Sequence, residues 1–314
     1  MKSPPPALKQ ISGPLCEQGL LGNHLLLSLK KHGRAYRKKL KRCRDGFSKK
    51  SVHELRVETR RLLALLDLLN KMGSQISLPQ RTRAPLKKRF DTLSSLRDAQ
   101  VQSDYVGKML VRRPELRAFH EFLQRRALRL ARSAVSTLKK GKMSELENGI
   151  ADLKQKLAKQ FSDPDAEARC YTGVQQVLIQ ARDKVLELRR QSVGDASLIH
   201  RGRIALKKFR YLLEALQPVL SGIGPRELKA MREEQALVGN IQDAEVLTAC
   251  INKWVSKKKL KKAPLLSLRK TLVRRRSTLL RAHLKKLAEP PDWNLPDGFE
   301  INLKSALPAS SSAS

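Results

Sequence analysis

Apolar residues recur with a helical period along nearly the whole chain from about residue 19 to residue 288. No stretch shows the strand-like alternation in which Val, Ile and Thr are enriched. Proline, glycine and short polar runs divide the periodic sequence into segments long enough to be helices. The pattern therefore predicts an all-α protein. The expected helices are residues 20–47, 51–73, 85–110, 114–140, 144–161, 166–191, 195–216, 225–255 and 263–288.

Two helix starts carry a capping-box signal, in which a serine is followed three residues later by a glutamate. These are Ser51 with Glu54 and Ser144 with Glu147. The short polar stretch at residues 162–165 contains a proline and is the best domain boundary. The expected organisation is a disordered segment at 1–18, a helical unit at 19–161, a linker at 162–166, a second helical unit at 167–288 and a mostly disordered tail at 289–314.

A helical pattern of basic residues occurs twice, at residues 52–61 (VHELRVETRR) and 199–208 (IHRGRIALKK). In each copy a histidine is followed by a base three residues on and by two bases seven and eight residues on. Steps of three and seven place the side chains within an arc of about 60° on a helix. We call His53, Arg56 and Arg60 the first ladder, flanked by Arg61, and His200, Arg203 and Lys207 the second, flanked by Lys208.

A second pair of motifs supports a duplication. Residues 96–101 (LRDAQV) match residues 241–246 (IQDAEV) at nearly the 147-residue offset of the two histidines. Two landmarks in the same order indicate a repeated four-helix unit. The predicted fold is therefore two tandem, pseudo-symmetric four-helix bundles.

The net charge of the chain indicates the class of its binding partner. The chain has 65 Lys and Arg against 29 Asp and Glu, a net charge of +36, while 40% of its residues are hydrophobic, which is enough for a core. An anionic polymer or membrane would relieve the self-repulsion. Aromatic residues make up only 4% and do not alternate with basic residues, which argues against a platform that stacks single-stranded nucleic acid.

Nothing in the sequence suggests secretion or membrane insertion. The N-terminus lacks the apolar core of a signal peptide, and no segment approaches the length of a membrane span. Cys16, Cys43, Cys170 and Cys250 are widely spaced and are expected to be buried free thiols. We expect a cytoplasmic protein.

The ladders have two interpretations. Basic residues on one helix face are often simply solvated, but the duplication and the scarcity of acidic partners favour an anion site. Each histidine is expected in the first turn of its helix, where unpaired N–H groups favour an anion. A bound phosphate would raise the histidine pKa. The alternative is a neutral histidine that donates to a nearby carbonyl.

Catalytic and metal motifs are absent from the sequence, so we expect neither enzyme activity nor a metal or cofactor. Asp98 and Asp243 are the repeated acids. An ion pair between each of them and a ladder base is favoured over a role as general base or metal ligand. Other basic side chains could extend a groove, although a solvated surface explains each of them separately. These additional candidates are Arg37, Lys38, Lys88, Arg89, Arg126, Arg210, Lys229 and Arg232.

The two ladder motifs and the two LRD/IQD motifs resemble the CHAD family (conserved histidine α-helical domain) over about residues 20–288. The resemblance implies two helical bundles around a basic central groove that binds inorganic polyphosphate, often at polyphosphate granules. The implied contacts are His53, Arg56, Arg60, Arg61, His200, Arg203, Lys207 and Lys208. Two positions break the repeat: Gly202 replaces the Leu55 type, which suggests close approach of a helix, and Gln242 replaces Arg97, which suggests an asymmetric corner.

The function expected from the sequence is therefore non-enzymatic polyphosphate binding. Non-specific nucleic-acid binding by the same surface is the alternative, because a charge of +36 would attract DNA. An enzyme of phosphate metabolism is a third possibility that no sequence feature supports.

Overall fold

The computed structural model describes residues 20–72, 80–140, 143–163, 165–220, 223–257, 263–291 and 293. The segment predicted to be disordered at 1–18, Cys16 and most of the predicted tail at 289–314 lie outside these residues. Every regular element in the described ranges is helical, as predicted. The α-helices are α1 (Leu20–Gly46), α2 (Lys49–Lys71), α3 (Gln80–Met109), α4 (Arg117–Lys140), α5 (Met143–Gln160), α6 (Ala166–Gly194), α7 (Ile199–Leu216), α8 (Pro225–Lys257) and α9 (Ala263–Ala288). Short 3-10 helices lie at Pro114–Leu116, Ala196–Leu198 and Gln217–Val219.

Two helix starts differ from the prediction. α2 begins at Lys49, and its cap is Ser48, whose extended backbone (φ −60°, ψ 153°) lets Oγ accept a hydrogen bond from the Ser51 amide. The expected capping box at Ser51 is therefore wrong, because this serine lies inside the helix and is buried. α3 begins at Gln80, so Pro85 lies within the helix instead of starting it.

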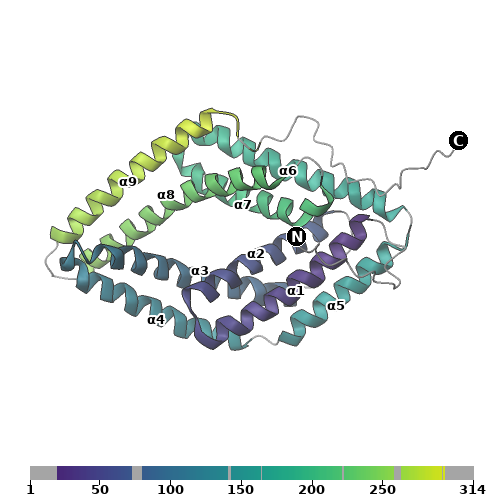
Figure 1. Ribbon diagram of the computed structural model, residues 1–314, viewed down its shortest axis with the longest axis horizontal. Helices are drawn as coiled ribbons and strands as arrows, with labels where there is room; N and C mark the ends of the chain where they lie inside the picture. Colours follow the sequence, from purple (N-terminus) through teal and green to yellow (C-terminus); the bar gives the residue numbers. More distant parts are fainter. Residues whose placement is uncertain are drawn as a thin grey trace, which may run out of the picture.

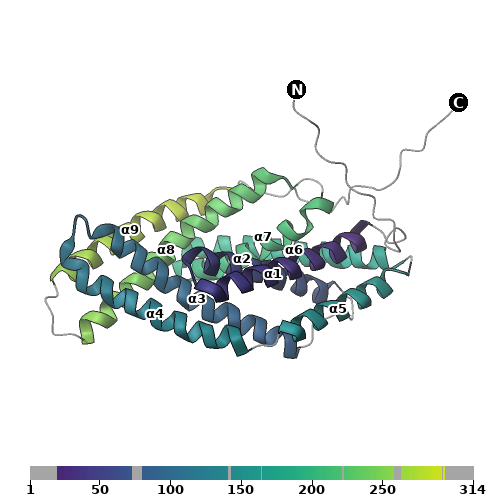
Figure 2. The same ribbon diagram turned by 60° about the horizontal axis from the view of Figure 1, so that its bottom comes forward.

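The helices pack in successive pairs. α1 contacts α2, α3 contacts α4, α6 contacts α7, and α8 contacts α9. Figure 1 shows them as an elongated ring, with α1–α5 along one long side and α6–α9 along the other. Figure 2, turned by 60°, again shows α3 beside α4 and α8 beside α9. The two sides meet where α2 packs on α7 and where α3 contacts α8.

Both hydrophobic clusters join the two sides of the ring. The larger cluster includes Leu25 of α1, Leu65 of α2 and Leu213 of α7, each fully buried. The smaller cluster combines α3 and α4 with α8 and α9, and the ring of Phe119 meets Trp254 edge-on at 5.6 Å. Burial of apolar surface across these contacts holds the two sides together.

Two buried carboxylates fasten helices to one another. Glu58 of α2 accepts hydrogen bonds from His32 (2.7 Å) and Lys39 (2.5 Å) of α1. Burial alone would raise the pKa of Glu58, but these two donors outweigh it and lower that pKa. Glu234 of α8 pairs with Arg189 of α6 and accepts from the Trp293 indole at 2.9 Å. Trp293 is only 1% exposed, although it lies within the predicted tail.

Three of the four cysteines lie in the described part of the chain, and all three are free. Cys43 and Cys170 are buried, as expected, while Cys250 is only partly buried. Burial raises the pKa of Cys43 to about 11, so this thiol stays protonated at neutral pH.

Gly202 does not serve the close helix approach that the sequence suggested. A Cβ at this position would lie 3.8 Å from Cβ of Leu188, which is an ordinary contact distance. The close approach occurs instead at Gly173 of α6, where a Cβ would lie 2.3 Å from the carbonyl oxygen of Met72 at the end of α2.

We therefore expect opposite effects from two glycine substitutions. Gly202→Ala should raise the free energy of unfolding by up to about 1 kcal/mol, because alanine has the higher helix propensity. Gly173→Ala should lower it by more than about 1 kcal/mol, since the backbone of α2 would have to move. Thermal unfolding followed by circular dichroism measures both. A destabilising Gly202→Ala would contradict the contact geometry.

Candidate functional site

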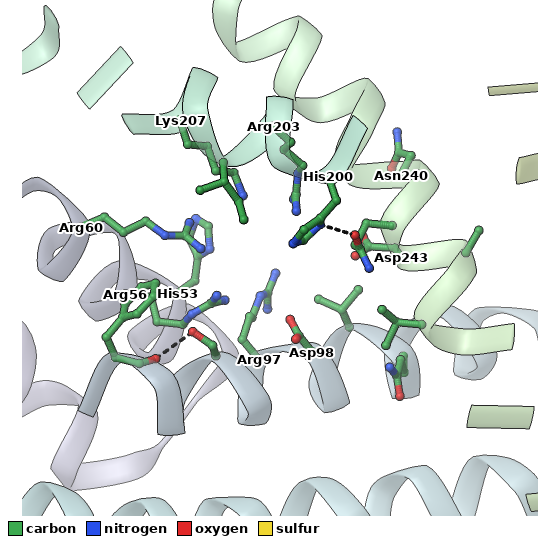
Figure 3. A pocket seen from close by; sticks show the side chains of 18 of the residues that line it. His53, Arg56, Arg60, Arg97, Asp98, His200, Arg203, Lys207, Asn240 and Asp243 are labelled. Atoms are coloured by element: carbon green, nitrogen blue, oxygen red, sulfur yellow. Dashed lines mark hydrogen bonds between the residues drawn. The ribbon is translucent and has the colours of Figure 1, made fainter. Parts of the chain in front are cut away.

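A cavity of about 840 Å³ lies between α2, α3, α7 and α8, with one wall completed by α9. Both ladders line it: His53, Arg56 and Arg60 come from α2, and His200, Arg203 and Lys207 come from α7. Figure 3 shows these side chains directed into the cavity from its two sides. Lys208 is also in the lining, whereas Arg61 is not.

The helical pattern of each ladder explains why it faces the cavity. On α2 the leucines on the opposite side, including Leu62, Leu65 and Leu69, are buried in the larger cluster. On α7, Phe209 and Leu213 are buried in the same cluster. Since α2 and α7 pack against each other, the remaining faces of both helices open onto one space.

The two arginines of the first ladder lie over an aromatic ring. The guanidinium carbons of Arg56 and Arg60 lie 5.7 and 5.0 Å from the centroid of Phe90 on α3. Burial, followed by the charge of Arg60, lowers the pKa of Arg56 to about 10, against the opposing effect of Asp98. The Nε atoms of Arg56 and Arg203 are buried and have no hydrogen-bond partner among the described residues.

Lys207 is the most perturbed base in the cavity. Burial is the largest cause, followed by repulsion from Arg203, Arg60 and Arg56, and together they lower its pKa to about 7. Arg60 comes from the other ladder, so the two ladders act on each other across the cavity. Burial and the neighbouring Lys71 likewise lower the pKa of Lys208.

The two histidines have different environments. Burial, then Arg97, Arg56 and Arg60, lowers the pKa of His53. His200 instead donates through Nδ1 to the Gln242 side-chain oxygen at 2.5 Å. Gln242 stands at the repeat position of Arg97, so the asymmetry suggested by the sequence is present in the geometry. His200 is in the first turn of α7, as expected, but His53 is in the second turn of α2, because that helix begins at Lys49.

The expected ion pairs of Asp98 and Asp243 are wrong. Both side chains are exposed to the cavity, and neither forms an ion pair or hydrogen bond within the described ranges. Burial and then the competing charges of Arg203 and Asp98 act on Asp243, and the net effect raises its pKa. Figure 3 shows the two carboxylates on the side of the cavity away from Arg56, Arg60 and Lys207.

Several predicted contacts surround one carboxylate outside the cavity. Glu214 of α7 pairs with Arg210, and its oxygens lie 3.6 Å from Arg61 and 3.6 Å from Arg232. Arg61 follows Arg60 by one residue, a rotation of about 100° around the helix, and this turns it away from the cavity.

The other additional candidates also lie outside the cavity lining. Arg37 pairs with Glu147 (2.8 Å), Arg126 donates to Gln102 (2.8 Å), and buried Arg89 lies 3.4 Å from the Tyr36 hydroxyl. Exposed Lys229 lies 3.9 Å from Glu233. Lys38 and Lys88 are on the exposed surfaces of α1 and α3.

The cavity includes residues that sequence reasoning did not select as contacts. Arg97 was visible as part of the repeated motif beside Asp98. Arg275 was visible only as one base in a basic cluster of the last predicted helix. The other lining residues carried no signal, because their place depends on how α3, α7 and α8 meet; these are Phe90, Tyr105, Tyr211 and Asn240. Although the chain has few aromatic residues, Phe90, Tyr105 and Tyr211 line the cavity.

Metal ligands do not gather anywhere in the described part of the chain: no group of three His, Cys, Asp or Glu side chains is arranged to hold an ion. None of the helices in that part is both long and apolar enough to span a membrane.

The family model described as CHAD domain matches residues 28–252. The crystal structure of the CHAD domain from the plant Ricinus communis is similar, with a TM-score of 0.64 and 18% sequence identity over 88% of this chain and 94% of that chain. At this identity the similarity shows the fold. No curated protein matches the sequence.

The pKa of Lys207 gives a pH test of the cavity. The folded-state pKa of about 7 is below the ordinary 10.5, so folding with a charged Lys207 is unfavourable at low pH. The penalty falls as the pH rises from about 7 towards 10.5, because the folded protein then binds fewer protons than the unfolded chain. Lys207→Met should therefore stabilise the protein most below pH 7 and least near pH 10.

Denaturant unfolding of both proteins at several pH values measures this difference. Lys38→Met, on an exposed surface, is the control for loss of one lysine. A stability difference between wild type and Lys207→Met that does not change with pH would contradict the perturbed pKa.

Proposed function

The chain belongs to the CHAD family, and on that premise we propose that it binds inorganic polyphosphate in the cavity between α2, α3, α7 and α8. The observation that carries the proposal is the convergence of the two ladders, six basic or imidazole side chains from two helices, on one cavity.

The chemistry of the lining suits a phosphate chain. Arginine presents a planar fork that can hold two phosphate oxygens, and lysine supplies a point charge. The Nε atoms of Arg56 and Arg203, which have no partner in the described ranges, are donors that a phosphate oxygen could satisfy. An anion would also relieve the repulsion that lowers the pKa of Lys207, so binding should favour its charged form.

We also propose that the site lies between two related, pseudo-symmetric four-helix units. The contacts α1–α2, α2–α3 and α3–α4 recur in the same order as α6–α7, α7–α8 and α8–α9, and α1–α4 corresponds to α6–α9. This recurrence supports two related four-helix units, with α5 as an addition to the first and residues 162–166 between them. The shared hydrophobic clusters argue that the two units fold together.

We propose binding without catalysis, in the cytoplasm and at polyphosphate granules. The net charge of +36 supports this, since it would draw the protein to a dense anionic surface at a high rate. Nucleic acid would be a weaker competitor for the same charges, because the two ladders match a chain of phosphates without bases along it.

The decisive experiment separates position from total charge. Arg56, Arg60, Arg203 and Lys207 are replaced together by Gln, and the matched control replaces Lys38, Lys88, Arg129 and Lys229, four exposed bases outside the lining. Hydrogen bonds to charged groups contribute about 1.5–3 kcal/mol each, against about 0–1 kcal/mol for exposed charges. Binding of long-chain polyphosphate should therefore fall by orders of magnitude in the first variant and only modestly in the second.

Circular dichroism is the folding control, and both variants should remain helical. Competition with DNA, heparin and orthophosphate tests the ligand: polyphosphate should displace DNA at a much lower phosphate concentration. If both variants lose affinity equally, the cavity is not the site and the protein is a general polyanion binder.

Salt dependence gives an independent test. If several phosphates are neutralised, log K for polyphosphate should fall linearly with log[salt], because condensed counterions are released on binding. The slope should become smaller in the cavity variant, and fluorescence titration at four salt concentrations is sufficient to measure it. An affinity that does not change with salt would indicate a small, mainly hydrogen-bonded ligand instead.

A further inference from the structure

The cavity has two chemically different ends, and only one of them suits a bare phosphate chain. The ladders supply the charged end from α2 and α7. Beyond Asp98 on α3, the next lining residues are Val101, Gln102 and Tyr105, and beyond Asp243 on α8 they include Val246 and Leu247. Leu272 of α9 completes a largely apolar end.

Asp98 and Asp243 separate the two ends. They occupy equivalent positions in the repeat, and Figure 3 shows Asp98 beside Arg97 and Asp243 beside His200. Along α3 and α8 the two aspartates precede the apolar lining residues Val101 and Val246. Their carboxylates have no hydrogen-bond or ion-pair partner among the described residues. Negative charge here would repel a polyanion that continued past the ladders, but it would accept hydrogen bonds from hydroxyl groups.

At the far end a guanidinium group lies over an aromatic ring. The guanidinium carbon of Arg275 lies 5.4 Å from the centroid of the Tyr105 ring, and Arg275 also donates to the Tyr105 hydroxyl at 3.3 Å. Tyrosine rings and arginine planes are the groups on which proteins stack nucleobases. Inorganic polyphosphate has no part that would use such a surface.

We propose that the cavity binds a nucleoside polyphosphate. The phosphate chain contacts the two ladders, the sugar hydroxyls donate to Asp98 and Asp243, and the base occupies the apolar end near Tyr105 and Arg275. This inference rests on the proposed function, because the phosphates use the same basic side chains. An aspartate that accepts from a ribose hydroxyl is a familiar arrangement in nucleotide sites.

The size of the cavity agrees with a ligand of this class. Its volume of about 840 Å³ lies within the range of about 300–1,000 Å³ that is typical of small-molecule sites. A long inorganic chain could still bind at the charged end and leave through its mouth. The two ligands would then compete for the ladders and differ only beyond the two aspartates.

The test compares ligands with the same number of phosphates. Isothermal titration calorimetry measures adenosine triphosphate, guanosine triphosphate and inorganic tripolyphosphate in the absence of divalent metal. At least one nucleotide should bind at least tenfold more tightly than tripolyphosphate, although electrostatics alone would favour the inorganic chain. Equal or weaker binding of both nucleotides would overturn the proposal.

The aspartates provide a test with opposite signs. In the double variant Asp98→Asn with Asp243→Asn, tripolyphosphate should bind more tightly because two repelling charges are removed. The preferred nucleotide should bind several-fold more weakly because its hydroxyl groups lose charged acceptors. Parallel strengthening of both ligands would show that the carboxylates only tune the charge, and the proposal would be wrong.

A third comparison tests the apolar end. Val101→Phe with Val246→Phe fills this end and should weaken the nucleotide at least tenfold while leaving tripolyphosphate within twofold. Val273→Phe on α9, at a position 45% exposed and outside the lining, is the matched control and should change neither. An equal loss of both ligands in the filled variant would count against a separate base site.

Long-chain polyphosphate is measured with the same proteins, so that the two proposals can fail separately. If polyphosphate binds the wild type but neither nucleotide exceeds tripolyphosphate, only the nucleotide inference fails. If the preferred nucleotide binds and polyphosphate does not, the proposed function is wrong while the site remains.

Discussion

The structure depends on hydrophobic packing that holds two groups of like charge together. α2 and α7 bury their apolar faces in one cluster, and this contact brings the first ladder towards the second. The repulsion is visible in Lys207, whose pKa of about 7 results from burial and from four arginines, two on each helix. This repulsion opposes folding in the absence of an anion. The free energy that offsets it must come from burial of apolar surface elsewhere.

The protein treats its basic residues in two different ways. Outside the cavity, several basic residues form ion pairs with carboxylates. His32 and Lys39 pair with Glu58, and Arg189 pairs with Glu234. Three arginines surround Glu214. These pairs fasten helices to one another. Inside the cavity the ladder bases have no such carboxylate partner among the described residues, and the two aspartates present stand away from most of them. Excess charge is thus concentrated where a ligand can reach it.

Divergence between the two repeats makes the cavity unequal. Arg97 repels His53, whereas Gln242 accepts a hydrogen bond from His200. α9 contributes Leu272 and Arg275 to the lining, whereas no described side chain of α4, its counterpart in the first unit, reaches the cavity. The duplicated motifs therefore supply the charged end from both repeats. Tyr105 and Arg275, which lie outside these motifs, make the other end chemically different.

Local periodicity was sufficient to predict the helices and the two ladders, because a step of three or seven residues determines which side chains share a face whatever the helix packs against. The same reasoning located the motif that contains Arg97 and Asp98. It gave the wrong start for α2, because Ser48 and not Ser51 is the cap. It also placed Arg61 in the site, although this residue lies on another face of α2 and is near Glu214.

Only the tertiary structure decided which faces meet. Packing between distant segments makes α2 and α7 share a cavity and places Arg275 over Tyr105, 170 residues away in sequence. It also leaves Asp98 and Asp243 without an ion-pair or hydrogen-bond partner among the described residues. Arg56, Arg203 and Lys207 acquire their lowered pKa values through burial in that cavity and through repulsion from neighbouring bases. Sequence patterns carry information about one helix at a time, whereas the chemistry of this cavity arises from five helices together.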